Sequence, residues 1–459
     1  MQRFSFKEIT KSIILVVLFF TTILLLYLNW TQSGSKFSIA DIIPIEIRKA
    51  EYVSENQILR PSRIIISDES SKSFSEFNGN SVTVFDTAKA EVKKLLGSSG
   101  VIVTEITKEQ YDAAMGEFGS VQLYFDCSIP FGSFCEHVGD RAPASSDIAD
   151  DFYILAFSEA DNFSFFIRSE GGCFRIISDV ETGAVNTIKS LVTGKETIMY
   201  PASEILGGAS DVYIPINMEI NYYEGAASPY IAAGEEIAET VFGDTFDFVR
   251  KISDTFGNVT YMYSYGAKRL TVSADGRLEF KEDTTAGTSN GFYADLETAI
   301  AFLSSTDSFA AGDLRLYKVE ELRSMQANRI RGYRFTFIQP AGDLGVASED
   351  PAAVIEVLGG KIAYATRRLL FLSYAQGDGY LAYDASNMIA ENSSAIYERL
   401  TNERADSADA AFRYVADRIE DLYPCYLERE GRLLPVWILK VDGKAFAFNM
   451  LTGDSYGLV

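Results

Sequence analysis

An apolar run near the N-terminus constrains this chain most, because such a run must either cross a membrane or be removed. No charged residue lies between Lys11 and Lys36, and residues 13–28 are apolar apart from Thr21, Thr22 and Tyr27. Strong apolar side chains contribute about −0.3 to −0.6 kcal/mol each, so insertion is favoured by roughly 4 to 8 kcal/mol. With its flanks the segment 12–30 is long enough to span a bilayer. We expect a single transmembrane anchor there.

Charge on the two sides of this segment predicts its orientation. Arg3, Lys7 and Lys11 precede it, whereas only Lys36 follows closely, so residues 1–11 should stay in the cytoplasm. A cleaved signal peptide is the alternative, with residues 33–35 as the cleavage site. The run is at the upper limit for a signal peptide, and no A-x-A site follows it. A mature N-terminus near residues 33–37 would contradict the anchor.

Composition separates the rest of the chain from several classes of protein. The 459 residues include 64 acidic and 41 basic side chains, yet 47% are hydrophobic and 13% aromatic, which indicates folded cores under an acidic coat. Residues 1–30 have a net charge of +2, which leaves −25 outside the membrane from a total of −23. Such a surface disfavours nucleic acid as a partner. One histidine, His137, excludes sites that need two imidazoles.

Local patterns predict an α+β extracytoplasmic part built from serial modules, each an antiparallel sheet with helices. Short strands are expected at 61–67 and 101–106, a helix capped by Asp86 and ended by Gly97, and a capping box from Thr107 to Gln110. The predicted domains are a cytoplasmic N-terminus at 1–11, the anchor at 12–30, a stalk at 31–60, and three outer domains at 61–207, 208–375 and 376–459. The two inner boundaries are placed at Gly207-Gly208 and in 375–379.

Hairpins are the clearest local signals. Asp442-Gly443 is a favoured two-residue turn, and pairing outward from it places Leu439 opposite Phe446 and Trp437 opposite Phe448. The apolar face needs a cover, which we expect from a helix at 408–422, stopped by Pro424 and carrying Phe412, Val415, Ile419 and Leu422. Further hairpins are expected at Gly171-Gly172, at Asp275-Gly276 (Val272 opposite Leu278, Leu270 opposite Phe280) and at Gly359-Gly360 (Val357 opposite Ile362, Ile355 opposite Tyr364), with another helix at 295–303.

Four cysteines, Cys127, Cys135, Cys173 and Cys425, lie in the outer part. Cys127 and Cys135 flank Pro130-Phe131-Gly132 and are able to close a small loop, a bridge that would add roughly 2 to 3 kcal/mol; buried free thiols are the alternative. Together with Glu136 and His137, these two cysteines are also candidates for a metal site or a Cys-His catalytic pair. Cys135 and His137 would lie on the same side of a strand. The segment lacks the close Cys-x-x-Cys pairs of zinc sites, which favours a structural loop.

Carboxylates supply no catalytic pattern. The acidic pairs at 150–151, 235–236, 349–350 and 420–421 are expected by chance in so acidic a chain, and Asp275, Asp378 and Asp442 are interpreted as turn residues before calcium ligands. No Walker A, G-x-S-x-G, H-E-x-x-H or EF-hand pattern occurs. We therefore predict no catalytic, cofactor-binding or metal-binding residue and a non-enzymatic protein.

The overall plan resembles the YycH family and, more loosely, the related YycI family. The resemblance rests on the basic N-terminus with its single helix, on Leu59-Arg60-Pro61-Ser62, on segments 333–337 and 355–361, and on the closing segment 434–448. It is diffuse along nearly the whole chain. The closing hairpin is also similar to PepSY-type units.

The YycH resemblance implies a membrane-anchored regulator in a Gram-positive bacterium, in which the N-terminal helix holds the chain in the cell membrane. Its expected partners are the sensor histidine kinase of a two-component system for cell-wall metabolism and a second, YycI-like single-helix regulator. One alternative is an anchored PepSY-like protein that restrains or escorts a cell-wall hydrolase. Another is a carboxylate-dependent wall or glycan hydrolase, which needs two acids roughly 5 to 10 Å apart in an open cleft.

Overall fold

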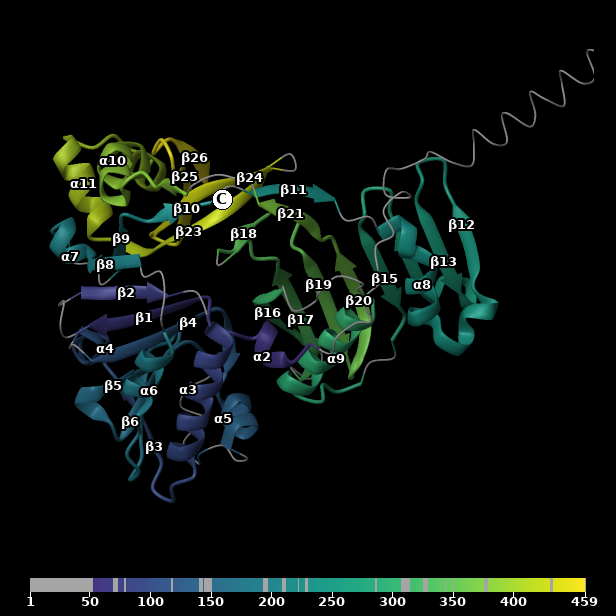
Figure 1. Ribbon diagram of the computed structural model, residues 1–459, viewed down its shortest axis with the longest axis horizontal. Helices are drawn as coiled ribbons and strands as arrows, with labels where there is room; N and C mark the ends of the chain where they lie inside the picture. The colour runs from purple at the N-terminus through teal and green to yellow at the C-terminus, as the bar shows by residue number, and fades with distance from the viewer. Residues whose placement is uncertain are drawn as a thin grey trace, which may run out of the picture. The chain divides into compact units, whose positions relative to one another are not determined.

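Three large sheets, antiparallel except for one parallel strand pair in the third, organise the described part of the chain (Figure 1). The computed structural model describes residues 53–458 without 69–72, 78–79, 117–118, 140–142, 144–150, 193–196, 209–211, 222, 228–229, 285–286, 307–313, 325–328, 343, 349, 375–378 and 430–431. The predicted N-terminus, anchor and most of the stalk lie outside these residues. Within the described residues, no helix combines the length and apolar character needed to cross a bilayer.

The first sheet has nine strands in the order β3-β7-β6-β5-β4-β1-β2-β8-β9. They are β1 (Arg63–Asp68), β2 (Ser73–Phe77), β3 (Ile102–Ile106), β4 (Ser120–Pro130), β5 (Asp151–Ser158), β6 (Ser164–Arg168), β7 (Cys173–Ile177), β8 (Thr197–Pro201) and β9 (Tyr213–Ile216). One face packs on α3 (Ser81–Leu96), α5 (Phe131–Gly139) and α6 (Ala184–Leu191). The other face packs on α4 (Lys108–Gly116) through Tyr111 and Met115 and is otherwise open to the cleft described below.

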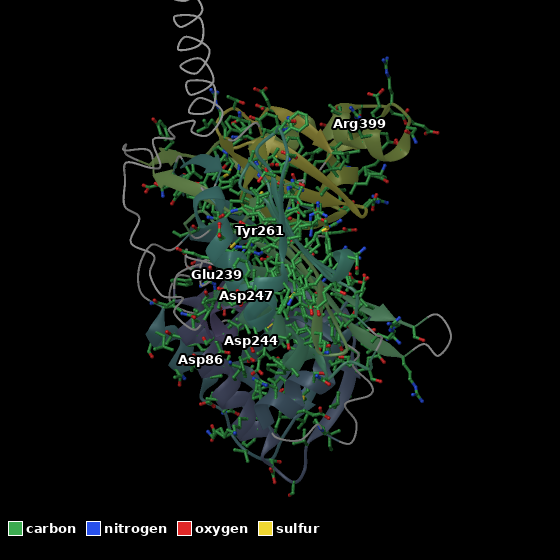
Figure 2. All side chains as sticks on the ribbon, turned by 90° about the vertical axis from the view of Figure 1, so that its right-hand side faces the viewer. Asp86, Glu239, Asp244, Asp247, Tyr261 and Arg399 are labelled. Carbon is green, nitrogen blue, oxygen red and sulfur yellow. The ribbon has the colours of Figure 1, made fainter. Side chains whose placement is uncertain are left out.

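The second sheet has eight strands in the order β12-β13-β14-β15-β20-β19-β17-β16. They are β12 (Arg250–Ser253), β13 (Val259–Tyr263), β14 (Lys268–Val272), β15 (Leu278–Glu282), β16 (Arg315–Arg323), β17 (Ile330–Ile338), β19 (Ala353–Leu358) and β20 (Lys361–Arg367). Helices α8 (Tyr230–Phe242) and α9 (Phe292–Ser305) contact its strands. Glu239 on α8 and Asp244 and Asp247 on the following 3-10 helix η4 (Gly243–Phe248) are exposed, as the acidic coat requires (Figure 2).

The third sheet has seven strands. They are β11 (Tyr223–Ala227), β18 (Val346–Ala347), β21 (Leu370–Tyr374), β23 (Ile419–Arg429), β24 (Arg432–Val441), β25 (Lys444–Asn449) and β26 (Ser455–Leu458). Helices α10 (Ala385–Thr401) and α11 (Ala408–Ala416) share one core with this sheet. Smaller elements are α2 (Glu55–Ile58), α7 (Ala202–Ile205), the paired β10 (Glu219–Ile220) and β22 (Tyr380–Leu381), and the 3-10 helices η3 (Glu159–Asp161) and η5 (Ser264–Gly266).

The predicted α+β class with antiparallel sheets is confirmed, and most hairpin registers are correct. Leu439 pairs with Phe446 and Trp437 with Phe448 across the Asp442-Gly443 turn, where both turn residues have positive φ. The pairs Val272–Leu278, Leu270–Phe280 and Val357–Ile362 are also confirmed. One pair is wrong, because a β-bulge between Glu356 and Val357 places Tyr364 opposite Glu356 and Ile355 opposite Ala365.

The helix predicted at 408–422 is wrong in its second half. Helix α11 ends at Ala416, and strand β23 begins at Ile419, so Ile419 and Leu422 belong to a strand. Their apolar side chains nevertheless enter the same core as Val415, Trp437 and the hairpin. The main cover of that core is α10, which contributes Met388, Ile389 and Ile396 and which the sequence interpretation missed.

The predicted helix ends agree with the structure in part. Asp86 does not cap α3, which begins earlier, at Ser81, but Gly97 does end it. The capping box of α4 is present: the Thr107 N–H donates to the Gln110 side chain, and the Gln110 N–H donates to the Thr107 hydroxyl. The segment Ala50–Val459 is one compact unit, and the first sheet reaches Ile216, beyond Gly207-Gly208. The division into three outer domains stays a prediction.

Candidate binding cleft

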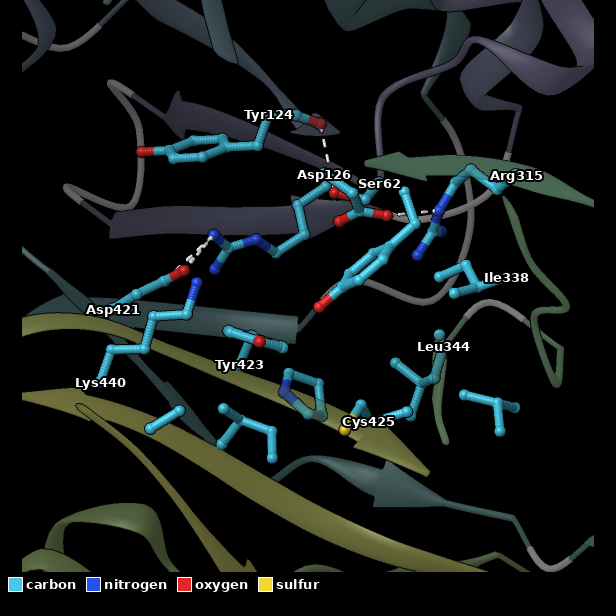
Figure 3. Close-up of a pocket in the computed structure, with 18 of the residues that line it drawn as sticks. Ser62, Tyr124, Asp126, Arg315, Ile338, Leu344, Asp421, Tyr423, Cys425 and Lys440 are labelled. Atoms are coloured by element: carbon cyan, nitrogen blue, oxygen red, sulfur yellow. Dashed lines mark hydrogen bonds and ion pairs between the residues drawn. The ribbon is translucent and has the colours of Figure 1, made fainter. Parts of the chain in front are cut away.

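A cleft of about 1720 Å³ lies where the open face of the first sheet meets the helix-free face of the third sheet (Figure 3). Strands β1 and β4 form one wall, β23 and β24 form the other, and the start of β16 with the segment 344–348 closes one end. The close-up shows Asp421 and Tyr423 on one wall of the cleft. Tyr124 and Asp126 lie across from them on the opposite wall.

Strand alternation delivers the polar side chains to the cleft. In β4, Tyr124 and Asp126 line the cleft, while Leu123, the residue before Tyr124, enters the core on the opposite face. In β23, Asp421, Tyr423 and Cys425 line it, while Leu422 enters the core under α10. Ile438 and Lys440 in β24 alternate in the same way with Trp437 and Leu439. Each wall therefore has one apolar face, which packs in a core and fixes the strand register. Its other face carries both polar and apolar side chains and lines the cleft.

Arg63 joins the two walls. Its Nη2 lies 3.0 Å from Oδ1 and 3.2 Å from Oδ2 of Asp421. Its guanidinium carbon lies 4.7 Å from the ring centre of Tyr124 and 5.5 Å from that of Tyr423, so the cation is held between two aromatic faces. Lys440 adds a second cation 5.4 Å from the Tyr423 ring.

Two further arginine–carboxylate pairs lie in the cleft. Nε of Arg315 lies 2.7 Å from Oδ2 of Asp126, an ion pair in which the N–H direction falls outside hydrogen-bond geometry. Arg368 lies 3.3 Å from Glu428, whose carboxylate also accepts a hydrogen bond of 2.6 Å from the Ser348 hydroxyl. Guanidinium groups bind these carboxylates, so the carboxylates differ from an acid–base pair that is open to substrate.

Charge in the cleft differs from charge on the chain as a whole. Seven basic and seven acidic residues line it, whereas the chain has 41 basic and 64 acidic residues. The basic residues are Arg63, Arg168, Arg315, Arg368, Arg429, Arg432 and Lys440, and the acidic ones are Glu76, Asp126, Glu170, Asp350, Glu420, Asp421 and Glu428. The cleft is thus balanced within an acidic protein, so it repels anionic ligands less than the surrounding surface does.

Tyrosines are the main aromatic component of the lining: Tyr124, Tyr153, Tyr213, Tyr317 and Tyr423. Burial raises the pKa of Tyr124 and Tyr423 well above the usual value for a phenol. Burial, with the nearby Asp126 and Cys425, also raises the pKa of Tyr317. All three phenols therefore stay protonated at physiological pH and are able to donate hydrogen bonds.

The structure separates Cys135 from His137. Both lie on helix α5 and not on the strand that was expected, so residues two apart point to different sides of it. Cys135 is buried in the core. The His137 ring stacks on Tyr293 at 4.0 Å, and its Nε2 lies 2.7 Å from Oε1 of Glu55. A Cys-His dyad is therefore wrong, and His137 has a packing role.

All four cysteines are buried free thiols, so the loop bridge between Cys127 and Cys135 is absent. Pro130 ends β4 and Phe131 begins α5, which replaces the predicted small loop. Burial raises the pKa of Cys135 and of Cys425 to about 12 and that of Cys127 still further. These thiols are correspondingly unreactive. Among the described residues, no group of three or more histidine, cysteine or acidic side chains is placed to hold a metal ion.

The acidic pairs have separate structural roles where they are described. Glu235 binds Lys251 and Asp350 binds Arg277, both as ion pairs, and Glu420 accepts a hydrogen bond from the Gly443 N–H. Asp275 and Asp442 are turn residues, as predicted. Asp150, Glu349 and Asp378 lie outside the described residues. In the pair 420–421, it is Asp421 that forms the ion pair with Arg63 across the cleft.

The sequence interpretation missed the residues that matter most for the cleft. Arg63, Asp126, Arg315 and Arg368 belong to no motif in the sequence, and the partner of each lies far away along the chain. A usable signal was present for two of them, since Arg63 and Asp126 each occur in a strand with strongly apolar neighbours. A charged residue at such a position needs a partner elsewhere in the fold.

No family model matches the chain, and no curated protein matches it. Two solved structures are similar in part. An uncharacterized protein of Eubacterium rectale ATCC 33656 aligns over 54% of this chain and 90% of its own, at 10% identity and a TM-score of 0.35. The YpeB C-terminal domain of Bacillus megaterium aligns over 51% of this chain and 98% of its own, at 9% identity and a TM-score of 0.28.

Proposed function

We propose that this chain is a non-enzymatic, membrane-anchored extracytoplasmic regulator that binds a sensor histidine kinase of a cell-wall two-component system. The observation that supports a binding role is the cleft, which is large and lined by tyrosines and arginine–carboxylate pairs. Tyrosine and arginine are the residue types that dominate protein-recognition hot spots. The choice of a kinase as partner rests on the YycH resemblance of the sequence.

Regulation of this kind requires only differential binding. A protein that binds one state of the kinase more tightly than the other shifts the kinase toward that state. A tenfold preference corresponds to about 1.4 kcal/mol, which a few hot-spot contacts supply. No bond is made or broken in the regulator, so the absence of a catalytic pattern in the sequence fits the role.

Co-purification from membranes tests the proposal. The tagged full-length chain is isolated in mild detergent from its own host, and the recovered proteins are quantified by mass spectrometry. We expect the sensor kinase and the second, YycI-like regulator to be enriched over a control in which residues 1–60 carry an unrelated soluble domain. Failure of both to associate, with unchanged cell-wall gene expression on deletion, would contradict the proposal.

A second candidate is a PepSY-like protein that restrains or escorts a cell-wall hydrolase. The observation that favours it is the C-terminal unit, where α10 and α11 pack on the β24–β25 hairpin in one core. The same co-purification separates the two candidates, because a hydrolase would then replace the kinase among the enriched proteins. A hydrolytic role for the chain itself predicts release of fragments from purified cell wall and loss of that release in Asp126→Asn. We expect no release.

A further inference from the structure

We infer that the cleft binds an extended peptide segment of a partner protein and that Arg315 binds a carboxylate of that segment. The inference rests on the proposed function in one respect, namely that the partner is a protein. It adds where the partner binds and which chemistry the bound segment carries.

The size of the cleft favours a polymer segment. Pockets for compact small molecules measure about 300 to 1,000 Å³, whereas this cleft measures about 1720 Å³. A small metabolite would leave much of the lining in contact with water. An extended segment contacts both walls and the closed end at once.

The lining favours peptide over glycan. Ile338, Leu344 and Ile438 give the cleft aliphatic patches beside its charged groups. A sugar chain carries hydroxyl groups around each ring, and hydroxyls placed against aliphatic side chains lose hydrogen bonds to water without replacement. A peptide alternates polar backbone groups with apolar side chains and so matches both parts of the lining.

Arg315 has the geometry of a carboxylate site. Its side chain is only 8% exposed, and Asp126 lies near Nε, which leaves the Nη side of the guanidinium facing the cleft. Figure 3 shows this head group between Asp126 and Ile338. Gly345 runs alongside, where a Cβ would lie 3.1 Å from Nη2 and 3.2 Å from Cδ1 of Ile338. A planar guanidinium binds a carboxylate through two parallel hydrogen bonds, and here it is already shielded from water.

A β-bulge places Tyr317 beside this arginine. Leu316 pairs with Phe337 and Lys318 with Thr336, so Tyr317 is the extra residue of β16 and has no partner in β17. Bulges of this kind redirect a side chain next to a binding site. Tyr317 lines the cleft, yet it is 44% exposed, so a large part of the side chain is available to a ligand. Arg315 and Tyr317 together form the anion end of the cleft.

The test begins with a random decapeptide library displayed on bacteriophage and selected on the full-length chain in detergent. Enriched peptides are synthesised, and their dissociation constants are measured by fluorescence anisotropy. We expect peptides with Asp, Glu or a free C-terminus next to aliphatic or aromatic residues. Changing that Glu to Gln, or Asp to Asn, should weaken binding about tenfold, as loss of a charge-assisted pair predicts.

Protein variants then locate the binding. Tyr317→Ala should raise the dissociation constants of the peptides about tenfold or more, as for a hot-spot tyrosine. Tyr265→Ala is the matched control, because Tyr265 is fully exposed and does not line the cleft. Arg315→Lys keeps a positive charge near Asp126 but loses the planar guanidinium that binds a carboxylate through two hydrogen bonds. The difference in dissociation constant between the acidic peptide and its amide form should therefore become smaller. Thermal unfolding of each variant verifies that it is folded.

Three outcomes would overturn the inference: no peptide family is enriched, the peptides bind Tyr317→Ala as tightly as wild type, or cell-wall glycan fragments compete for the cleft while peptides do not. Failure here and failure of the proposed function are distinguishable. If the kinase co-purifies equally with wild type and with Tyr317→Ala, the regulator role stands and the cleft assignment falls. If peptides bind at the cleft but no kinase co-purifies, the cleft stands and the kinase assignment falls.

Discussion

At the scale of single residues, arginine holds the cleft together. Arg63, Arg315 and Arg368 each bind a carboxylate from a distant part of the chain. A largely buried ion pair contributes little over an apolar pair, but removal of one partner leaves an uncompensated charge. The three ion pairs therefore contribute little to the stability of the fold. Their main effect is to determine which parts of the chain come together.

The Arg63 clamp gives the first prediction. Arg63→Ala leaves Asp421 without its cation and removes a group packed between Tyr124 and Tyr423, so the free energy of unfolding should fall by about 2 kcal/mol. Urea titration measures the change. The double variant Arg63→Ala/Asp421→Ala should lose clearly less than the sum of the single variants. Additive losses would show that the two side chains do not interact.

Asp295 predicts a pH dependence. It is fully buried at the start of α9, where the Ser289 hydroxyl donates a 2.6 Å hydrogen bond to Oδ2, and burial raises its pKa above the usual value. A raised pKa means that the folded state holds a proton that the unfolded state releases, so stability falls as pH rises above about 4, the unfolded value, through the folded value. Asp295→Asn has no such loss. The stability of Asp295→Asn relative to wild type should therefore increase with pH over this range and then level off; a difference that decreases would contradict the assignment.

The cysteines predict a chemical result. Because all four thiols are buried and the pKa values of Cys135 and Cys425 are raised to about 12, iodoacetamide at pH 8 should leave the native protein unmodified. In denaturant without reductant, intact mass should show four adducts. Two adducts would indicate a disulfide.

At the scale of elements, the turns and the helix at 295–303 were predictable, whereas the helix that covers the C-terminal hairpin was not. A two-residue turn such as Asp442-Gly443 fixes the register of its hairpin from local sequence alone. The helix at 408–422 failed because Ile419 and Leu422 are apolar at a spacing that suits either a helix or a strand facing one core. Pro424 in fact lies within β23, opposite Trp437. Which apolar segment covers a sheet depends on the whole fold, so α10 was missed.

Gly332 predicts how tightly two strands approach each other. A Cβ there would lie 1.7 Å from the carbonyl oxygen of Val357, so Gly332→Ala forces β17 and β19 apart. We expect a loss of about 2 to 3 kcal/mol in the free energy of unfolding. Gly100→Ala is the control, because no atom lies within 4 Å of that Cβ and stability should barely change. Equal effects of the two substitutions would contradict the strand packing.

At the scale of the whole molecule, long-range pairing was out of reach of the sequence. Arg63 and Asp421 are 358 residues apart, and no local pattern links them. The balanced charge of the cleft within an acidic chain is likewise a property of the fold, since composition reports only the average. The expectation of a non-enzymatic protein without catalytic residues stays a prediction.

The most direct test of the proposed regulatory role is kinase activity. The full-length chain and the sensor kinase of its host are reconstituted together in proteoliposomes, and the rate of kinase autophosphorylation is measured with and without the chain. We expect a change in rate that saturates with the amount of chain added and that the Tyr265→Ala variant also produces. An autophosphorylation rate that is the same with and without the chain, with both proteins folded and inserted, would contradict it.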